Sequence, residues 1–377
     1  MALRVGVVGG GQLARMMIAP AVELGVELRV LAEDEGMAAA LAATAVGDYR
    51  DADTVLRFAR DVDVITFDHE HVPQDVLAAL VDAGVAVRPG PHALQFAQDK
   101  LHMRRRLAEL GMPQPDWAAV GDAAGVEAFL ADHGGRAVVK TPRGGYDGKG
   151  VRVVSSAHDA DDWFTALAED GRGGELLIEE LVPFTRELAQ QVARRPSGEV
   201  RAYPLVETVQ RDGVCAEVLA PAQRTGEREQ QVTSEIAVGI AEGLDVAGML
   251  AVELFETADR VLVNELAMRP HNSGHWTQDG AVTSQFEQHL RAVLDLPLGD
   301  PAPKAPWTVM INILGGPSSG GLTDRFGDAM ARHPEAKVHT YGKSPRPGRK
   351  VGHVNVSGDD LDDVAYAARA AAAVFLD

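Results

Sequence analysis

The sequence is poor in cysteine, in basic residues and above all in lysine. The single cysteine among 377 residues, Cys215, excludes an internal disulfide and a zinc site made of several cysteines, and it is typical of a reducing compartment. Only 36 Lys and Arg stand against 55 Asp and Glu. The resulting net charge of −19 argues against nucleic acid as a partner. Seven of the 36 basic residues are lysines and 29 are arginines.

No long uninterrupted apolar segment and no leader-like start is visible in the sequence. The chain enters a strand pattern at residues 3–8, without a basic region or a cleavage site before it. We therefore expect a cytoplasmic protein with no secretion signal and no membrane anchor. A hydrophobic content of 46% with 24% charged residues is typical of globular proteins, and the length favours two or three domains.

The periodicity of apolar residues predicts three successive regions. Strand patterns at 3–8, 26–31, 62–67 and 85–87, with a helix over 12–24, indicate a parallel sheet covered on both faces. A helix over 96–108 then leads to a smaller α+β unit with helices over 123–131 and 159–169 and strands over 136–140, 151–154 and 175–179. Residues 184–295 indicate a mainly antiparallel sheet with two helices. A tail follows, with strands over 309–314 and 337–341 and a helix over 362–375.

A first glycine loop, Gly9-Gly10-Gly11-Gln-Leu-Ala, follows the first strand and opens a helix. It fits the G-x-G-x-x-G/A pattern, and an acid (Glu33 or Asp34) stands about 20 residues further on, as in dinucleotide sites. Three interpretations are open, namely a dinucleotide site, a tight structural turn and contact with a phosphorylated substrate. We favour the last, because backbone amides at a helix N-terminus accept any phosphate.

A second glycine loop, residues 140–150, connects two strands and carries Lys140 and Lys149. Its amides and ammonium groups are suited to a triphosphate, and the absence of G-x-x-x-x-G-K-[ST] before a helix excludes a P-loop. The following apolar strand ends in Glu179 and Glu180, and such a strand end can present backbone groups to an adenine edge, with Glu187 near a ribose hydroxyl. A flexible hairpin with an ordinary strand end is the alternative.

Two glutamates interrupt apolar strands on either side of a predicted hairpin turn at 257–260. Glu253 and Glu265 would face one another as buried charges that need a counter-ion. Facing carboxylates can hold Mg²⁺ between phosphate oxygens. The alternative is a pair of exposed glutamates at a sheet edge.

Two clusters of donors follow these carboxylates. The stretch 269–278 holds Arg269, His271 and Asn272 among other polar groups, which suits a small planar oxyanion. A zinc site from His271 and His275 is disfavoured, because Pro270 and Gly274 oppose the helix that it needs. Residues 341–353 carry four basic residues and no acid in a loop rich in Pro and Gly, which suits a phosphate monoester or, alternatively, a solvated basic turn.

Taken together, these segments resemble the ATP-grasp superfamily through Lys140, the second glycine loop, the 179–182 segment, Glu253 and Asn264-Glu265. More narrowly, 66–73, 144–150, 264–277 and 346–353 are similar to the N5-carboxyaminoimidazole ribonucleotide synthase family, the ATPase subunit of bacterial phosphoribosylaminoimidazole carboxylase. The likeness runs in order from Gly9 to about residue 356, and 264–277 is its most specific stretch.

The resemblance implies an α/β and α+β fold with three domains. These are a Rossmann-like domain over 1–92, an ATP-grasp domain over 93–296 with a small lobe over about 113–182, and a C-terminal domain over 297–377. ATP and bicarbonate would form carboxyphosphate, which carboxylates the exocyclic amine of 5-aminoimidazole ribonucleotide in de novo purine synthesis. Mg²⁺ (or Mn²⁺), a homodimer and transient contact with the downstream mutase are also implied.

The site residues that the resemblance implies fall into four groups. The ATP contacts are Lys100, Lys140, Gly145, Tyr146, Asp147, Gly148, Lys149, Gly150, Val151, Glu179, Glu180, Leu181, Val182, Glu187, Gln210, Asn264 and Glu265. Glu253 and Glu265 would hold the metal. Arg269, His271, Asn272 and Lys343 are assigned to bicarbonate and catalysis. The ribonucleotide contacts are Glu70, Tyr146, Lys149, Ser273, Arg346 and Lys350.

This sequence departs from the family pattern at four positions. Lys100 stands where many relatives have an arginine, which keeps the charge but loses the fork of donors. Gln210 stands where many have a histidine, and it keeps a donor without titrating. His69 and His71 replace an aromatic residue and an asparagine.

The alternatives are a related ATP-grasp ligase (a formate-dependent glycinamide ribonucleotide transformylase or a biotin carboxylase), a module that only senses nucleotide, and a Rossmann dehydrogenase. Retention of both Glu253 and Glu265 counts against the sensing module.

Overall fold

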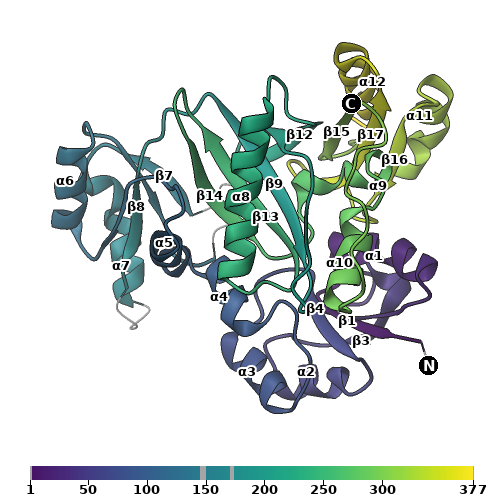
Figure 1. Ribbon diagram of the computed structural model, residues 1–377, viewed down its shortest axis with the longest axis horizontal. Coiled ribbons are helices and arrows are strands. Elements are labelled where there is room, and N and C mark those ends of the chain that lie inside the picture. The colour runs from purple at the N-terminus through teal and green to yellow at the C-terminus, as the bar shows by residue number, and fades with distance from the viewer. Residues whose placement is uncertain (1, 145–149, 170–173, 377) are drawn as a thin grey trace.

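The computed structural model describes residues 2–144, 150–169 and 174–376, and within them the chain forms three sheets (Figure 1). The N-terminal sheet has four parallel strands in the order β3-β2-β1-β4. Its elements are β1 (Arg4–Val8), α1 (Gln12–Glu23), β2 (Glu27–Ala32), β3 (Ala43–Val46), α2 (Ala52–Ala59), β4 (Val64–Phe67) and α3 (Gln74–Asp82). The predicted Rossmann-like fold is confirmed.

Two details of this sheet differ from the prediction. The strand expected at 85–87 is only a single bridge between Val87 and Ile65. The edge strand β3 was not predicted, because its four residues are only half-buried to exposed and so lack an apolar run.

The helix expected over 96–108 is two helices, α4 (Pro91–Gln98) and α5 (Lys100–Glu109). Asp99 separates them because its backbone is extended (φ −134°, ψ 110°) and its side chain accepts hydrogen bonds from the N–H groups of Leu101 and His102. Such an N-cap satisfies donors that have no partner inside the new helix. Because of this break, α5 begins at Lys100, which lines the pocket described below.

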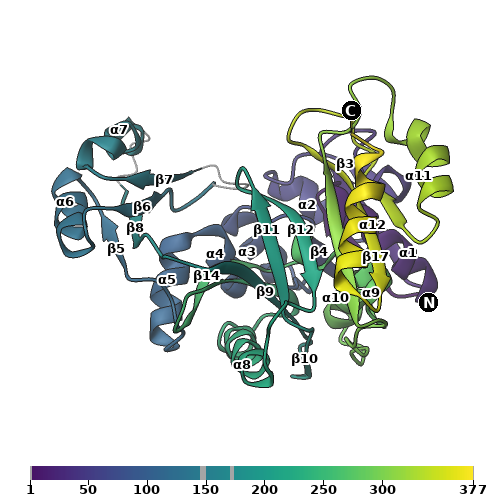
Figure 2. The same cartoon turned by 90° about the horizontal axis from the view of Figure 1, so that it is seen from above.

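The second sheet forms a small lobe of four antiparallel strands in the order β5-β8-β6-β7. Its elements are β5 (Trp117–Val120), α6 (Ala123–Asp132), β6 (Ala137–Lys140), β7 (Val151–Val154), α7 (Asp161–Glu169) and β8 (Leu176–Glu180). The two helices lie outside the sheet at one end of the molecule, and a compact apolar core is buried under them (Figures 1 and 2).

The third sheet has nine strands and spans the rest of the chain in the order β14-β13-β9-β11-β12-β15-β17-β16, with β10 paired to β9. Its strands are β9 (Arg186–Arg194), β10 (Val200–Ala202), β11 (Val206–Arg211), β12 (Val214–Ala220), β13 (Gly248–Glu256), β14 (Val261–Ala267), β15 (Trp307–Leu314), β16 (Lys337–Thr340) and β17 (Lys350–Gly358). The helices of this region are α8 (Glu227–Gly243), α9 (Thr277–Gly280), α10 (Gln285–Val293), α11 (Phe326–Arg332) and α12 (Leu361–Ala373).

The large sheet crosses the predicted boundary at 296/297, because β12 pairs antiparallel with β15 from Glu217↔Ile311 to Ala220↔Thr308. The C-terminal strands therefore extend the central sheet (Figure 2). The basic loop predicted over 341–353 is shorter than expected, since β17 begins at Lys350 and carries His353 into the core. No helix in the described ranges is long and apolar enough to cross a membrane.

Candidate active site

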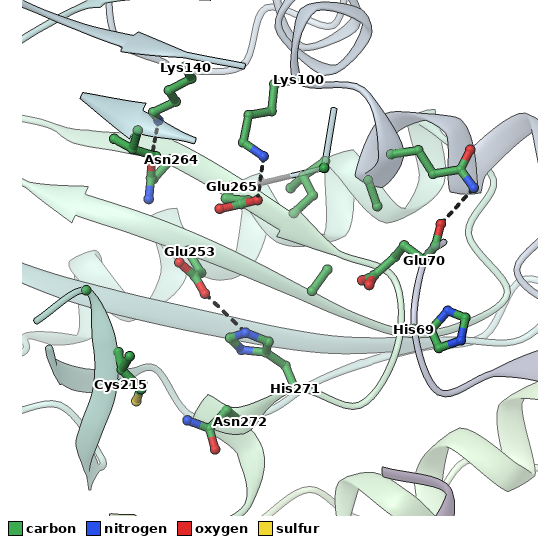
Figure 3. A pocket seen from close by; sticks show the side chains of 18 of the residues that line it. His69, Glu70, Lys100, Lys140, Cys215, Glu253, Asn264, Glu265, His271 and Asn272 are labelled. Carbon is green, nitrogen blue, oxygen red and sulfur yellow. Dashed lines mark hydrogen bonds and ion pairs between the residues drawn. The ribbon is translucent and has the colours of Figure 1, made fainter. Parts of the chain in front are cut away.

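A cleft of about 1540 Å³ opens where the three sheets meet, and most of the predicted site residues line it (Figure 3). They come from the N-terminal sheet, the small lobe and both halves of the large sheet. The predicted residues in its wall are Glu70, Lys100, Lys140, Val151, Glu179, Glu180, Leu181, Val182, Glu187, Gln210, Glu253, Asn264, Glu265, Arg269, His271, Asn272, Lys343, Arg346 and Lys350.

The remaining predicted residues lie elsewhere. Gly145, Tyr146, Asp147, Gly148 and Lys149 are outside the described residues. The carbonyl of Gly150 accepts a hydrogen bond from the Thr141 N–H. Ser273 is buried beneath the surface, with its Oγ 2.9 Å from His271 Nδ1. Ser273 thus contacts a predicted site residue.

A buried charge cluster closes one end of the cleft. Lys140, at the end of β6, lies 2.7 Å from Glu179 of β8 and donates to Asn264 Oδ1 at 3.1 Å. Arg104 of α5 lies 2.6 Å from the same Glu179. Burial alone would raise the pKa of Glu179, but the charges of Lys140 and Arg104 outweigh it and lower that pKa. One carboxylate is thus shared by two cations.

Arg104 was not among the predicted site residues. Its guanidinium is fully buried and also donates to the carbonyls of Val263 and Asn264, at 2.7 and 2.8 Å. It therefore ties α5 and β8 to the strand that carries Asn264 and Glu265. Only its place in a basic helix was visible in the sequence, and nothing there distinguishes it from its neighbours Arg105 and Arg106.

Glu187 lies near the start of β9, beside another carboxylate. Burial raises the pKa of Glu187 to about 7, the nearby charge of Glu253 adds to this, and a hydrogen bond with Gln210 opposes it. This carboxyl group therefore changes its protonation state near neutral pH. Phe184 and Phe255, which stack at 4.7 Å, line the same part of the cleft and were also not predicted.

The two predicted metal ligands face each other directly. Glu253 of β13 is paired with Glu265 of β14 in the strand register, and the pairing shifts by one residue just beyond them, next to Asn264. The expectation that both are buried is wrong, because their side chains are 29% and 44% exposed at the wall of the cleft. Each has a side-chain partner, since His271 Nε2 lies 3.1 Å from Glu253 and the ammonium group of Lys100 lies 3.2 Å from Glu265.

This donor set suits Mg²⁺, since hard oxygen ligands from two facing carboxylates and an adjacent amide leave further positions for phosphate oxygens and water. The described residues contain no group of three or more His, Cys, Asp or Glu side chains that could hold a metal alone. His275, the second histidine of the zinc alternative, is buried, and its Nδ1 lies 2.9 Å from Gln285 Nε2.

The oxyanion-type cluster follows β14 and reaches toward the N-terminal sheet. Arg269 forms an ion pair with Glu70 at 2.7 Å. Burial would raise the pKa of Glu70, but the charge of Arg269 outweighs it and lowers that pKa. His271 is held by the side chain of Gln285, which accepts from its N–H and donates to its carbonyl, both at 2.8 Å. Arginine, imidazole and amide donors are thus held in one wall.

The first glycine loop is filled by the protein's own carboxylates. Asp68 accepts the Ala14 N–H at 2.8 Å, and Glu33 accepts the Gly10 N–H at 3.1 Å. A side chain at Gly11 would collide with Asp68, because an added Cβ would lie 1.9 Å from its carboxylate. These bonds support the tight structural turn over the phosphate contact that we favoured. Gln12 still reaches the cleft, where its Oε1 accepts from Lys343 at 2.7 Å.

Three family models match the chain in succession. The ribonucleotide synthetase preATP-grasp domain matches residues 1–98, the ATP-grasp domain matches 105–286, and the phosphoribosylaminoimidazole carboxylase C-terminal domain matches 308–367. Together with the small lobe facing the large sheet across a lysine-lined cleft, they define an ATP-grasp protein.

Curated relatives and solved structures narrow this class. The N5-carboxyaminoimidazole ribonucleotide synthase of Mycobacterium tuberculosis is 49% identical over 373 residues, covering 98% of this chain and 86% of the relative. The structure of the Thermus thermophilus enzyme has a TM-score of 0.86 at 34% identity, covering 99% and 98%. That from Aspergillus clavatus, solved with ADP and 5-aminoimidazole ribonucleotide, has a TM-score of 0.88 at 29% identity, again covering 99% and 98%. The chain belongs to the N5-carboxyaminoimidazole ribonucleotide synthase family.

Proposed function

We propose that this protein uses ATP and bicarbonate to carboxylate the exocyclic amine of 5-aminoimidazole ribonucleotide, giving N5-carboxyaminoimidazole ribonucleotide, ADP and phosphate. The observation that carries the proposal is the order of groups along one cleft. Lys140 and Glu187 lie at one end, the facing carboxylates Glu253 and Glu265 lie between with Lys100 beside Glu265, and Arg269 comes next beside Glu70. Two structures of the Aspergillus clavatus relative, one with ATP and one with ADP and the aminoimidazole ribonucleotide, support both ligands.

The reaction has two steps. A bicarbonate oxygen attacks the γ-phosphorus, the bond to the β,γ-bridging oxygen breaks, and ADP leaves with that oxygen. The amine nitrogen then attacks the carboxyl carbon of carboxyphosphate, phosphate leaves, and the nitrogen loses a proton. Such a sequence needs positioning, stabilisation of charge on the phosphoryl oxygens and exclusion of water.

The ATP end of the cleft supplies charge and shape. In this proposal Lys140 and Lys100 neutralise phosphate oxygens. Glu187 accepts a hydrogen bond from a ribose hydroxyl, and the 179–182 segment faces the adenine edge. The shared carboxylate Glu179 leaves a positive excess, because it balances only one of its two cations. That excess favours a polyphosphate at this end.

Glu253 and Glu265, with Asn264 beside them, would hold Mg²⁺ or Mn²⁺. The ion would supply a Lewis acid that neutralises charge on the phosphates. His271 and Lys100 pair with these carboxylates in the described structure, so both side chains are available to turn toward anionic ligands.

The acceptor end aligns the second step. Arg269, His271, Asn272 and Lys343 are assigned to bicarbonate, and Glu70 to the amine. The 2.7 Å pairing of Arg269 with Glu70 supports neighbouring bicarbonate and amine sites, as attack of the amine on the carboxyl carbon requires. Arg346 and Lys350 lie in the same wall for the ribonucleotide phosphate. Tyr146 and Lys149 complete the assignment of ribonucleotide contacts, whereas the buried Ser273 acts on the site through its contact with His271.

The proposal includes the division into domains at 1–92, 93–296 and 297–377. It also includes a homodimer in the cytoplasm and transient contact with the mutase that consumes the product. The carbon–nitrogen bond of the product's carbamate breaks readily, and this gives such contact a chemical reason.

The decisive measurement is phosphate release from ATP in the presence of bicarbonate and the aminoimidazole ribonucleotide, with each omitted in turn. Release that needs both, and that ignores formate, glycinamide ribonucleotide and biotin, supports the proposal. Release with formate and glycinamide ribonucleotide instead would favour the transformylase alternative.

Arg269→Ala should lower bicarbonate-dependent turnover by about 100- to 1000-fold, the effect typical of losing one preorganised donor to a developing anion. Arg201→Ala is the matched control, because Arg201 is exposed and pairs with Glu199, and neither residue lines the cleft. Equal kinetics of Arg269→Ala and wild type, with and without the ribonucleotide, would remove Arg269 from the reaction.

A further inference from the structure

The two polar atoms of the Asn272 amide differ in their hydrogen bonding. The residue is only 7% exposed and lies in the wall of the cleft, directly after His271. Its Oδ1 accepts a hydrogen bond, whereas its Nδ2 is buried, has no nitrogen or oxygen partner and lies beside the Cys215 thiol. In Figure 3 this nitrogen is on the side of Asn272 that faces Cys215, which also lines the cleft.

The partner of Asn272 is Asn312, which comes from the middle of β15 and is 5% exposed. The Asn312 Nδ2 donates to the backbone carbonyl of Cys215 at 2.8 Å and to Asn272 Oδ1 at 3.1 Å. A backbone carbonyl can only accept, so this contact determines which end of the Asn312 amide carries the nitrogen. The second hydrogen on the same nitrogen then determines which end of Asn272 carries the oxygen.

We propose that Asn312 is a positioning residue that orients the Asn272 amide so that its Nδ2 is presented as a hydrogen-bond donor to bicarbonate. The identity of the anion rests on the proposed function. Oxygen and nitrogen of an amide have nearly the same shape, so the two orientations of Asn272 differ mainly in hydrogen bonding. The opposite orientation presents an acceptor, which repels a carboxylate-like anion.

This arrangement joins the C-terminal strands to the chemistry. Asn312 lies outside the lining of the cleft and contacts two residues that line it, the side chain of Asn272 and the backbone carbonyl of Cys215, across the seam at which β15 is added to the central sheet. The strand therefore contributes to anion binding as well as to packing.

Asn312→Leu removes the donor, keeps the branched shape of the side chain and adds no charge. We expect about a 10- to 100-fold fall in kcat/KM for bicarbonate, the size of effect that follows loss of a hydrogen bond to a charged group. The KM for ATP should stay within about twofold of wild type, because Asn312 has no contact with the nucleotide end. Wild-type values of kcat/KM for bicarbonate in Asn312→Leu, or equal increases of both KM values, would overturn the inference.

Asn355→Leu is the matched control. Asn355 is equally buried in the neighbouring strand β17, and it donates to the carbonyl of His275 and to Asp279 instead of to the site. The Asn355→Leu variant should lower the midpoint of thermal unfolding as much as Asn312→Leu does, and it should leave the KM for bicarbonate unchanged. A rise in that KM equal to the rise in Asn312→Leu would show a general effect of damaging this sheet.

A double-mutant cycle with Asn272→Ala tests whether the effect of Asn312 depends on Asn272. If Asn312 acts through Asn272, Asn312→Leu should have no further effect on kcat/KM for bicarbonate in the Asn272→Ala background. Additive losses would overturn the inference. Asn312→Ser serves in its place if the leucine variant does not fold. Phosphate release by the wild-type enzyme that needs neither bicarbonate nor ribonucleotide would instead disprove the proposed function. Failure of the proposed function is thus distinguishable from failure of the inference about Asn312.

Discussion

The carboxylates at the two ends of the ATP-binding half of the cleft differ in how their charge is compensated. Glu179 is 3% exposed and lies between two cations, Lys140 and Arg104. Glu253 and Glu265 are partly exposed, face one another and have one partner each, the His271 imidazole and the Lys100 ammonium group. A buried, doubly compensated carboxylate holds elements together, whereas a carboxylate at an open wall can exchange its partner for a ligand cation.

The comparison predicts that substitution at Glu179 mainly changes stability and that substitution at Glu265 mainly changes activity. Removing one member of a buried charge cluster leaves uncompensated charges in a region without water. Removing a partly exposed carboxylate leaves its cation free to be solvated.

The largest effect is expected for Glu179→Gln. It should lower the free energy of unfolding by about 3–5 kcal/mol, because Lys140 and Arg104 would remain buried without a counter-charge. Urea unfolding followed by circular dichroism measures this change. Glu180→Gln is the control in the same strand, since Glu180 pairs with the exposed Arg260, and it should cost about 1 kcal/mol or less. Equal losses in the two variants would end the distinction between a buried cluster and a surface pair.

Glu265→Gln should lower turnover by about 100-fold or more, through weakened stabilisation of charge on the phosphates. Its unfolding free energy should change by about 1 kcal/mol or less. The assay is phosphate release at increasing Mg²⁺, and the variant should need more Mg²⁺ than wild type. Glu256→Gln, which lies in β13 and pairs with Arg186, is the control and should keep the wild-type Mg²⁺ requirement. An unaltered Mg²⁺ requirement in Glu265→Gln would argue against Glu265 as a ligand.

Sequence patterns predicted the part of this site that depends on local order along the chain. The hairpin of β13 and β14 was predictable from its turn, but the turn alone would pair Glu253 with Asn264. The one-residue shift in register beyond Leu254 and Val263 brings Glu265 opposite Glu253, and no local pattern indicated that shift. The scarcity of lysine was also informative, since Lys100, Lys140, Lys343 and Lys350 all line the cleft. In an arginine-rich sequence, lysine is concentrated where a compact ammonium suits a phosphate.

The rest of the site depends on partners distant in sequence, and no local pattern reports them. Arg104 is identified only by its contacts with Glu179 and the β14 backbone, which are 75 to 160 residues away. Asp68 fills the first glycine loop from 54 residues further on, and a loop filled in this way has the same sequence as one that binds phosphate. The break between α4 and α5 was missed because an aspartate is compatible with both a helix interior and an N-cap.

The smallest effect concerns Glu187, which has an acidic neighbour where Glu179 has basic ones. Its pKa is raised from 4.5 to about 7, so between these values the folded protein keeps a proton that the unfolded chain has released. Stability contributed by this group therefore falls as the pH rises through that window and is constant above it. Glu187→Gln removes the titration, so the unfolding free energy of the variant relative to wild type should increase with pH by up to about 2 kcal/mol. Urea unfolding of both proteins at intervals between pH 5 and pH 8 measures the difference. A difference that does not change with pH would mean that Glu187 titrates normally, and that burial beside Glu253 leaves its carboxyl group as well solvated as in the unfolded chain.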